Sequence, residues 1–472
     1  MKLKSIFTNS FGILFSRVTA LGRDVTMASA LGASIWTDIF FVAFKLPNLF
    51  RRIFAEGAFT QAFMPSFISS KQKGVFATAI FLRFMLILVI FSIFVSIFPE
   101  LLTKLITPNW SDEQIAQTAP LTAINFWYLD LVFIVTFLGT LLQYKNHFAT
   151  TAMSTALLNI AMIAALLLYM KDEPETIIIA LSIAVLIGGL LQVIAHLIAI
   201  KSFNLQRLLL GGWKYRNKES KQKDLNKEKK EFNNLFFPSV WGNSMPQISS
   251  FIDTILASFL ISGSISYLFY ANRIFQFPLA IIAIAASIAL FPAISKAIKR
   301  DNEALAYQHL NRVFWILLAL LGFATLTGII LAEPIVWLLF ERGAYTVQMT
   351  QQTASVLAMY MLGLIPYGLA KLFALFLYAK KEHKKAAKIA TITLVINIMV
   401  SFTLMKLMGA SGLALAGSIG GLIFFILTIR GVGFDKFMKI MNYKKLFYVV
   451  VGLVVSAFLL VFVNGVLMEW IR

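Results

Sequence analysis

Residues 36–56 read WTDIFFVAFKLPNLFRRIFAE, an apolar segment that keeps Asp38, Lys45, Arg51 and Arg52 among aromatic and aliphatic residues. The segment is long enough to cross ~30 Å of hydrocarbon as a helix. A charged side chain at bilayer depth costs roughly 2.5–3.5 kcal/mol unless it faces water or a partner. The stretch therefore predicts a membrane-spanning helix that borders a polar pathway.

Similar apolar segments recur along the whole chain, which is 59% hydrophobic with a mean hydropathy of +0.80. A spanning segment must satisfy its own backbone hydrogen bonds, so these segments are predicted to be helices. The predicted fold is an all-α integral membrane protein with about 13 transmembrane helices. The predicted spans are 6–31, 36–56, 76–98, 119–143, 150–170, 176–200, 235–261, 266–293, 313–333, 353–378, 387–407, 411–430 and 446–468.

The basic residues predict the orientation. If the N-terminus is cytoplasmic, most of the 42 Lys and Arg residues fall in inner segments and few in outer ones, as the positive-inside rule requires. The odd number of spans then places Arg472 outside. Because Arg17, Arg23 and Asp24 interrupt the first apolar segment, a cleaved signal peptide is not expected. The net charge of +20 follows from topology, and nucleic acid is not an expected partner.

One long polar segment divides the chain. Residues 1–201 form a predicted N-terminal six-helix lobe, and 202–234 a basic cytoplasmic linker. The linker is expected to be solvated and to touch anionic lipid head groups, with a regulatory partner site as the alternative. Residues 235–431 form a second six-helix lobe, and 432–472 an additional transmembrane helix.

A proline pattern relates the two halves. Pro47 lies in the second span and Pro65 follows 18 residues later near the cytoplasmic surface, and Pro278 and Pro292 form a similar pair in the eighth span. Since proline removes a backbone hydrogen bond and kinks a helix, we expect matched bends lining a central cleft, as in transporters built from parallel halves.

Basic residues inside the spans point to an anionic cargo. Arg17, Arg23, Arg51 and Arg273 lie at several depths, and guanidinium groups bind phosphate through two parallel hydrogen bonds. The eight basic residues in the spans are Arg17, Arg23, Lys45, Arg51, Arg52, Arg83, Arg273 and Lys371. A helical wheel does not decide whether Arg51 or Arg52 faces inward. The structural alternative for the deep arginines is an ion pair with Asp24, Asp38 or Asp253.

The N-terminal sequence resembles the signature of the MurJ/MviN family of lipid II flippases. The resemblance lies in TDIFFVAFKLPNLFRRIFAEGAFTQAFMP at 37–65, with SR at 16–17 and GRD at 22–24. A second match is ASFL at 257–260 and YANR at 270–273.

The resemblance implies two six-helix lobes around a central cationic cavity. It also implies transport of lipid II, the undecaprenyl-diphosphate-linked disaccharide-pentapeptide, from the inner to the outer leaflet of the bacterial inner membrane for peptidoglycan synthesis. The predicted substrate-binding residues are Arg17, Arg23, Arg51, Arg273, Asp38, Arg52, Lys45 and Asn48. Predicted partners are lipid II, membrane lipids and cell-wall synthesis proteins.

Two features depart from the family pattern. Many members have acids at the positions of Asn272 and Gln276, so a role for those carboxylates is not expected here. Members often have two spans after the twelfth that form a groove for the lipid tail. This chain has room only for 446–468, so the groove should be incomplete or built differently.

Asp253, in the seventh span, needs a partner because a lone buried carboxylate is costly. We expect an ion pair with Arg273 or, as the resemblance implies, a sodium ion that Asn397 and Ser401 also contact. Another partner, or a protonated acid, is the third alternative.

Other functions are weighed against lipid II transport. An exporter of another polyprenyl-diphosphate-linked oligosaccharide, of the O-antigen type, is the main alternative; a drug exporter or an anion channel agrees less well with the excess of bases and the kinked halves. No phosphate-binding loop of the Gly-x4-Gly-Lys-Ser/Thr kind is present, so an enzyme is not expected. Without cysteine and with scattered histidines, neither a metal site nor a cofactor is predicted. The membrane potential or a Na+ gradient is the expected driving force.

Overall fold

The protein is built from helices. The computed structural model describes residues 3–215 and 219–471, and the side chains of residues 11–52, 57–215, 224–240, 244 and 247–471. Helices account for nearly all of this part of the chain, which contains no strand. The predicted all-α fold is therefore confirmed.

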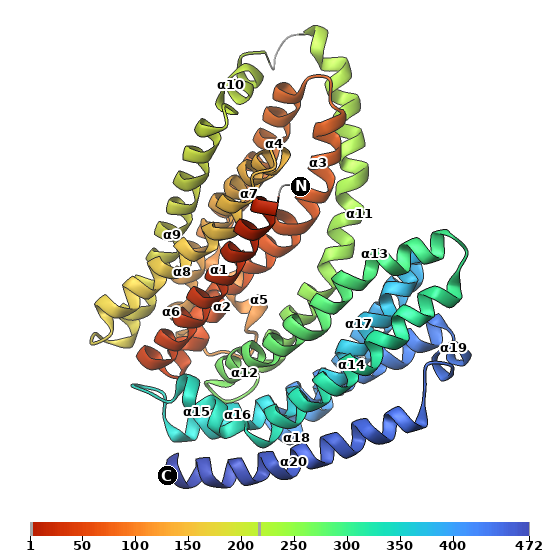
Figure 1. Cartoon of the computed structure of the whole chain (residues 1–472). Helices are drawn as coiled ribbons and strands as arrows, with labels where there is room; N and C mark the ends of the chain where they lie inside the picture. The colour runs from red at the N-terminus through yellow and green to blue at the C-terminus, as the bar shows by residue number, and fades with distance from the viewer. Residues whose placement is uncertain (1–2, 216–218, 472) are drawn as a thin grey trace. The chain divides into compact units, whose positions relative to one another are not determined.

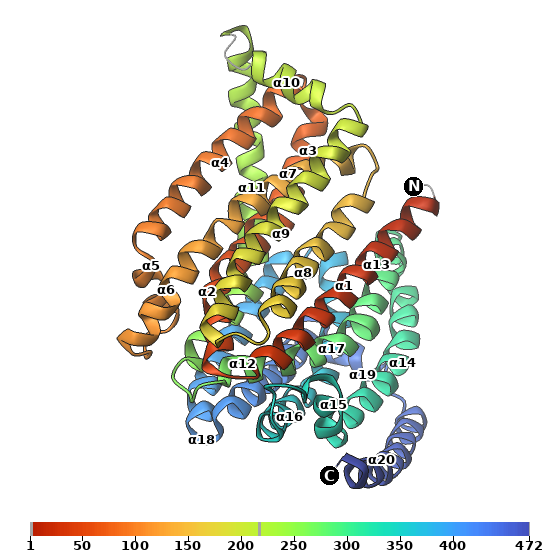
Figure 2. The same cartoon turned by 90° about the vertical axis from the view of Figure 1, so that its left-hand side faces the viewer.

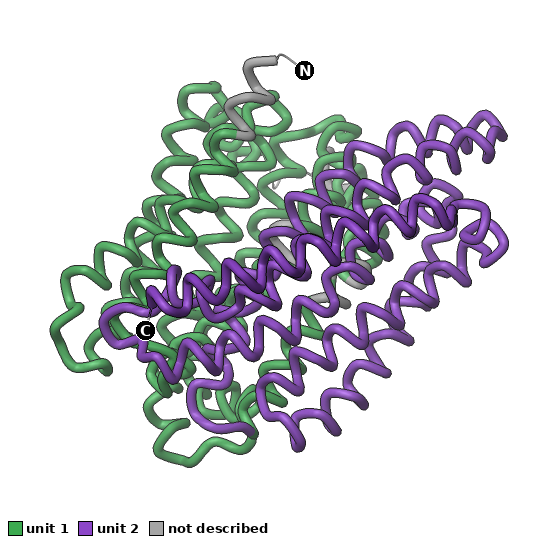
Figure 3. Tube along the Cα trace, turned by 60° about the horizontal axis from the view of Figure 1, so that its bottom comes forward, with its two compact units in different colours: residues 1–259 green, residues 260–472 purple. Residues whose placement is uncertain are grey.

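The chain forms two compact units, Met1–Phe259 and Leu260–Arg472 (Figure 3). This division differs from the predicted lobes, which begin the second lobe at residue 235. The physical reason is that the helix ending at Ala257 packs against the helices of the first unit. The predicted lobe boundaries, which follow the order of spans rather than compactness, stay a prediction.

The first unit runs from α1 to α11 (Figures 1 and 2). Its elements are α1 (Leu3–Leu31), α2 (Ile35–Phe50), the π-helix η1 (Arg51–Phe59), α3 (Thr60–Ser69), α4 (Lys73–Ile97), α5 (Pro99–Ile106), α6 (Asp112–Phe126), α7 (Tyr128–Tyr144), α8 (Ala149–Tyr169), α9 (Pro174–Ser202), α10 (Gln206–Tyr215) and α11 (Glu219–Ala257). Helix α8 packs on both α1 and α9, and η1 and α3 pack on α11.

The second unit runs from α12 to α20. Its elements are α12 (Ser264–Pro278), the π-helix η2 (Leu279–Ile284), α13 (Ala285–Lys299), α14 (Glu303–Ile330), α15 (Ala332–Phe340), α16 (Val347–Met361), α17 (Leu364–Ala379), α18 (His383–Val432), α19 (Phe434–Met438) and α20 (Tyr443–Ile471). Helix α20 packs on α14 and α15.

Long apolar helices identify a multi-pass membrane protein. Within residues 3–215 and 219–471, 9 helical stretches are long and apolar enough to span a bilayer. One of them, α18, is broken at Gly409, where φ is 58°, and so covers two predicted spans. The predicted spans 6–31 and 36–56 lie in α1 and in α2 with η1, and the predicted span 235–261 lies mostly in α11 and ends four residues beyond it. Charged residues interrupt the apolar surface of these helices. The count of thirteen spans stays a prediction.

A π-helical segment follows the first proline of the pair in each unit. In the first unit η1 begins four residues after Pro47, and in the second η2 begins directly after Pro278. Short π-helical segments and proline are the usual causes of bends within a helix. The places predicted for the two bends therefore coincide with interruptions of α-helical geometry.

The expectation that 202–234 is solvated throughout is wrong, because some of its described residues are packed into the first unit. These residues form α10 and the first part of α11, whose Leu225 and Phe232 are buried. Ser70 Oγ donates to Glu228 Oε2 at 2.9 Å, and Arg83 Nη1 donates to Asn233 Oδ1 at 3.2 Å. The many charged residues of α11 led to the prediction of a solvated segment. An amphipathic helix needs only a few apolar residues on its packed side, so the burial of that side was missed. Residues 216–218 lie outside the described part.

Phenylalanine rings hold this part of α11 against the first unit. Phe232 contacts the rings of Phe59, Phe76 and Phe84, with centroids 5.8 to 6.4 Å apart. Buried aromatic pairs add about 0.5–1.5 kcal/mol beyond their area. The cluster fixes α11 beside η1, the segment that carries Arg51 and Arg52.

Candidate functional site

Helix α1 docks closely on α8 along the surface that carries Arg23. A Cβ placed on Gly12 would come within 2.9 Å of Ala152 Cβ, and Ser16 Oγ donates to the Ala152 carbonyl at 2.8 Å. Gly12, Ser16 and Arg23 recur at helical spacing and therefore share one side of α1. The predicted stripe of Ser16 and Arg23 exists, and it faces α8.

Arg23 is buried and its guanidinium is already bound within the first unit. Its Nε and Nη2 donate to Asp24 Oδ1 at 3.0 and 2.5 Å, and Nη1 donates to Asn159 Oδ1 at 3.1 Å. A buried pair of this kind is costly to break, by about 3–5 kcal/mol, because the remaining charge stays desolvated. Of the predicted structural alternatives, the pair with Asp24 is the one formed.

Asn159 is a functional candidate that the sequence reasoning missed. Besides accepting from Arg23, its Nδ2 donates to the Ser16 carbonyl and to Thr19 Oγ1, both at 3.2 Å. One buried amide therefore binds about one turn of α1, from Ser16 to Thr19, and the guanidinium of Arg23. An asparagine within an apolar span is itself a signal, because a polar side chain buried in hydrocarbon needs partners.

Arg17 and Asp38 differ sharply in their surroundings. Arg17 is exposed on α1, although it adjoins the docked Ser16. Asp38 is buried in the first turn of α2, where a carboxylate interacts favourably with the helix N-terminus. Arg17 is thus a cation open to a ligand, and Asp38 belongs to the packed frame of the site.

Lys45 connects α2 to α11 inside the first unit. Its Nζ donates to Ser250 Oγ at 3.0 Å, and it interacts electrostatically with Asp253, one turn further along α11. The structure therefore gives Asp253 a basic neighbour that the sequence reasoning did not name. The predicted pair with Arg273 and the predicted sodium site both combine residues of the two units, and both stay predictions.

Asn48, Arg51 and Arg52 surround the junction of α2 and η1. Arg51 Nη2 donates to Asn48 Oδ1 at 3.0 Å, and both arginines are half-buried. Arg51 opens the π-helical segment, so the 3.6-residue period of an α-helix holds up to Phe50 and no longer places the residues beyond it. A helical wheel left Arg51 and Arg52 undecided because Pro47 interrupts the regular hydrogen bonding four residues earlier.

Arg273 lies on α12, in the second unit. Its guanidinium carbon is 4.9 Å from the centroid of the Phe269 ring, a cation–π contact that leaves the planar donors oriented. On the same helix, Gln276 Nε2 donates to Oδ1 of Asn272, the residue that precedes Arg273. The two neutral amides that replace the acids of the family pattern therefore bind one another.

Asn397 and Ser401 share a side of α18, as predicted. Both are buried, and Ser401 Oγ donates to Asn397 Oδ1 at 3.0 Å. A Cβ on Gly420 would lie 2.8 Å from Asn397 Nδ2, so this amide is packed against the second part of α18. Among the described side chains, no group of three or more His, Asp or Glu is placed to hold a metal ion.

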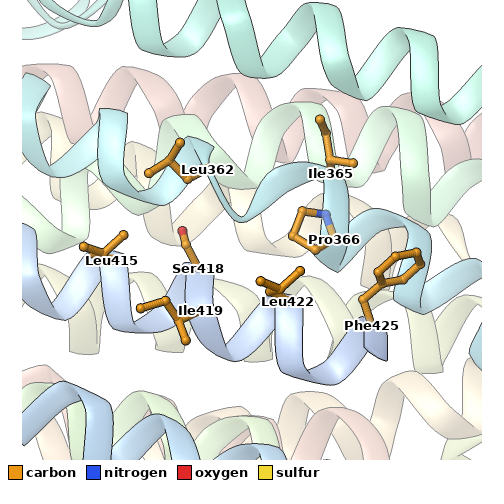
Figure 4. A pocket seen from close by; sticks show the side chains of 8 residues that line it. All are labelled: Leu362, Ile365, Pro366, Leu415, Ser418, Ile419, Leu422 and Phe425. Carbon is orange, nitrogen blue, oxygen red and sulfur yellow. The ribbon is translucent and has the colours of Figure 1, made fainter. Parts of the chain in front are cut away.

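A pocket of about 350 Å³ in the second unit lies at the break between α16 and α17 (Figure 4). Its lining is apolar apart from Ser418, whose hydroxyl donates to the Met359 carbonyl at 2.6 Å. None of the predicted site residues lines it. This pocket therefore offers nothing to an anionic group.

Comparison with known proteins decides the family. A family model described as "Lipid II flippase MurJ" matches residues 27–472. The chain belongs to the MurJ family. Two MurJ relatives bear the name "Probable lipid II flippase MurJ". The one from Helicobacter pylori strain J99 is 48% identical over 90% of this chain and 94% of its own length, and the one from Buchnera aphidicola subsp. Baizongia pistaciae is 30% identical over 98% and 90%.

Solved structures agree with the MurJ assignment. The structure titled "Lipid II flippase MurJ, inward closed conformation" superimposes with a TM-score of 0.78 at 26% identity, covering 98% of this chain and 99% of that one. A Vibrio cholerae MATE transporter superimposes with a TM-score of 0.57 at 12% identity, over 93% and 97%. The second likeness shows the fold alone, which MurJ proteins share with multidrug transporters of the MOP superfamily.

Proposed function

We propose that this protein is a flippase that moves lipid II from the inner to the outer leaflet of the bacterial inner membrane. The observation that carries the proposal is the MurJ family match over residues 27–472, joined by 48% identity to a relative named as a lipid II flippase. A flippase relocates its substrate without making or breaking a covalent bond, so the protein is not an enzyme.

We expect the protein to bind lipid II through the diphosphate group of the lipid. Arg17 is exposed on α1, Arg51 and Arg52 are half-buried on η1, and Arg273 is half-buried on α12. Each guanidinium offers a planar fork of donors that matches a phosphate. On α2, Asn48 accepts from Arg51 and Lys45 lies one turn before it, whereas Arg23 acts from within the α1–α8 contact.

The proposed transport cycle is alternating access. The π-helical segments η1 and η2 interrupt the proline-containing helices of both units, and interrupted helices supply the bends on which such a cycle depends. The proposed orientation has a cytoplasmic N-terminus and a periplasmic C-terminus. The membrane potential or a Na+ gradient drives the cycle, and proteins of cell-wall synthesis are proposed partners.

A complementation experiment tests the proposal. A bacterium depleted of its own lipid II flippase should grow and keep its shape when it expresses this chain. Purified protein in vesicles should then expose labelled lipid II on the opposite leaflet. Transport of an O-antigen precursor without transport of lipid II would overturn the proposal in favour of the other polyprenyl-diphosphate cargo.

A further inference from the structure

Helix α10 has two contrasting sides: one packs closely on α4, and the other exposes large apolar groups. It starts four residues after α9 ends, beyond a tight turn at Asn204, whose φ is 56°. Helix α10 then lies along the start of α4 (Figure 2). The transport mechanism assigns no role to this helix.

The packed side is a contact of backbone on backbone. A Cβ on Gly212 would lie 2.1 Å from the Gly74 carbonyl oxygen and 2.4 Å from Thr78 Oγ1. A Cβ on Gly74 would lie 2.5 Å from the Leu208 carbonyl oxygen. Any side chain at either glycine would push the helices apart, because the opposing atoms are backbone and cannot move aside. Gly211, next to Gly212, meets nothing within 4 Å.

The opposite side exposes large apolar groups. On a helix with 3.6 residues per turn, Leu210 points away from Leu208 and Gly212. Leu210 is 69% exposed, and its neighbour on the surface, Trp213, is 55% exposed. Arg207 and Lys214 flank Leu210 on the other edge and are also exposed.

The depth of this surface follows from its attachment. Gly74 lies two residues before the predicted span 76–98, and α10 begins six residues after the predicted span 176–200. Helix α10 is therefore held where hydrocarbon meets water. Tryptophan is enriched at that depth, and helices with apolar and basic edges lie in the plane of the interface.

We propose that α10 is a membrane-surface anchor, with Leu210 and Trp213 inserted into the leaflet and Arg207 and Lys214 against lipid phosphates. The glycine contact transmits this attachment to α4, so that α10 holds one end of the first unit at a fixed depth. In the proposed orientation the leaflet is the cytoplasmic one.

Site-directed spin labelling tests the anchor directly, because the chain contains no cysteine and each label is unique. The full chain is placed in vesicles of phosphatidylcholine and phosphatidylglycerol. Leu210→Cys and Trp213→Cys report on the apolar edge, and Lys227→Cys, exposed on the charged part of α11, reports on water. We expect the ratio of collisions with oxygen to collisions with a water-soluble nickel complex to be several-fold higher at 210 and 213 than at 227.

Equal ratios at the three positions would overturn the proposal, and the surface would then be open to a soluble partner. Gly212→Ala in the Leu210→Cys background should shift the label toward water, whereas Gly211→Ala should not. An unchanged depth in Gly212→Ala would overturn the coupling to α4. If Gly212→Ala does not fold, the collision ratios of the three single-cysteine variants still show whether α10 is inserted into the leaflet. None of these measurements depends on transport, so they test the membrane anchor independently of the flippase function.

Discussion

Single residues decide how the basic groups of the site are held. Asn159→Leu removes the acceptor of Arg23 Nη1 and leaves a buried donor unpaired, at a cost of about 1–3 kcal/mol. We expect lipid II flipping in vesicles to fall roughly tenfold, the equivalent of ~1.4 kcal/mol. Asn159→Asp keeps the acceptor for Arg23 and should reduce the flipping rate less than Asn159→Leu does.

A matched control for Asn159 exists in the same unit. Asn125 is also a buried asparagine, and its Nδ2 donates at 3.0 Å to a neutral hydroxyl, Ser182 Oγ. Asn125→Leu should lower stability by a similar amount and leave flipping near the wild-type rate. Equal loss of flipping in both variants would show that Asn159 acts only through stability.

The arginines should separate into two kinds. Arg17→Ala, Arg51→Ala and Arg273→Ala should abolish complementation at normal protein level, and lysine should rescue poorly because it lacks the planar fork. Arg23→Ala should in addition lower the protein level, because it strands buried Asp24. Arg83→Ala, which loses only an exposed contact to Asn233, is the control. Normal growth with two or more of the first three variants would rule out the proposed binding group.

At the scale of elements, the first part of α11 should be structural. Phe232→Ala empties the centre of the aromatic cluster around Phe59 and should lower the free energy of unfolding by about 3–5 kcal/mol. Phe237 is 62% exposed, so Phe237→Ala should change the free energy of unfolding little. Thermal unfolding in detergent measures the stability of both variants.

Deletion of residues 217–229 should likewise destabilise the protein, because it removes buried Leu225. A deletion variant as stable as the wild type would contradict the packing of α11 on the first unit.

At the scale of the whole molecule, the topology should be thirteen spans with the two termini on opposite sides. The prediction rests on the concentration of Lys and Arg in inner segments, since basic loops resist translocation. A periplasm-active reporter fused after Arg472 should be active, and one fused within 202–234 should not. A reporter after Arg472 that works only in the cytoplasm would contradict the odd number of spans.

The sequence by itself determined the class of the protein, the position of most of its long apolar helices and its family. These properties are local: a run of apolar residues either spans ~30 Å or does not, and the TDIFFVAFKLPNLFRRIFAE stretch at 37–56 needs no partner to be recognised. The paired prolines also predicted where each long helix is interrupted, near η1 and η2. Local sequence marks these places because a missing backbone donor acts at its own position.

Only the tertiary structure decided which charges are engaged. Arg23 meets Asn159 across 136 positions of sequence, and Lys45 meets Ser250 across 205. Such contacts depend on which helices are neighbours, and hydropathy carries no information on that. The same holds for α10 and α11: a charged segment reads as solvated until a packed partner shows that Gly212, Leu225 and Phe232 form its buried side. The burial of a few residues on one side of a helix is a property of the assembled unit.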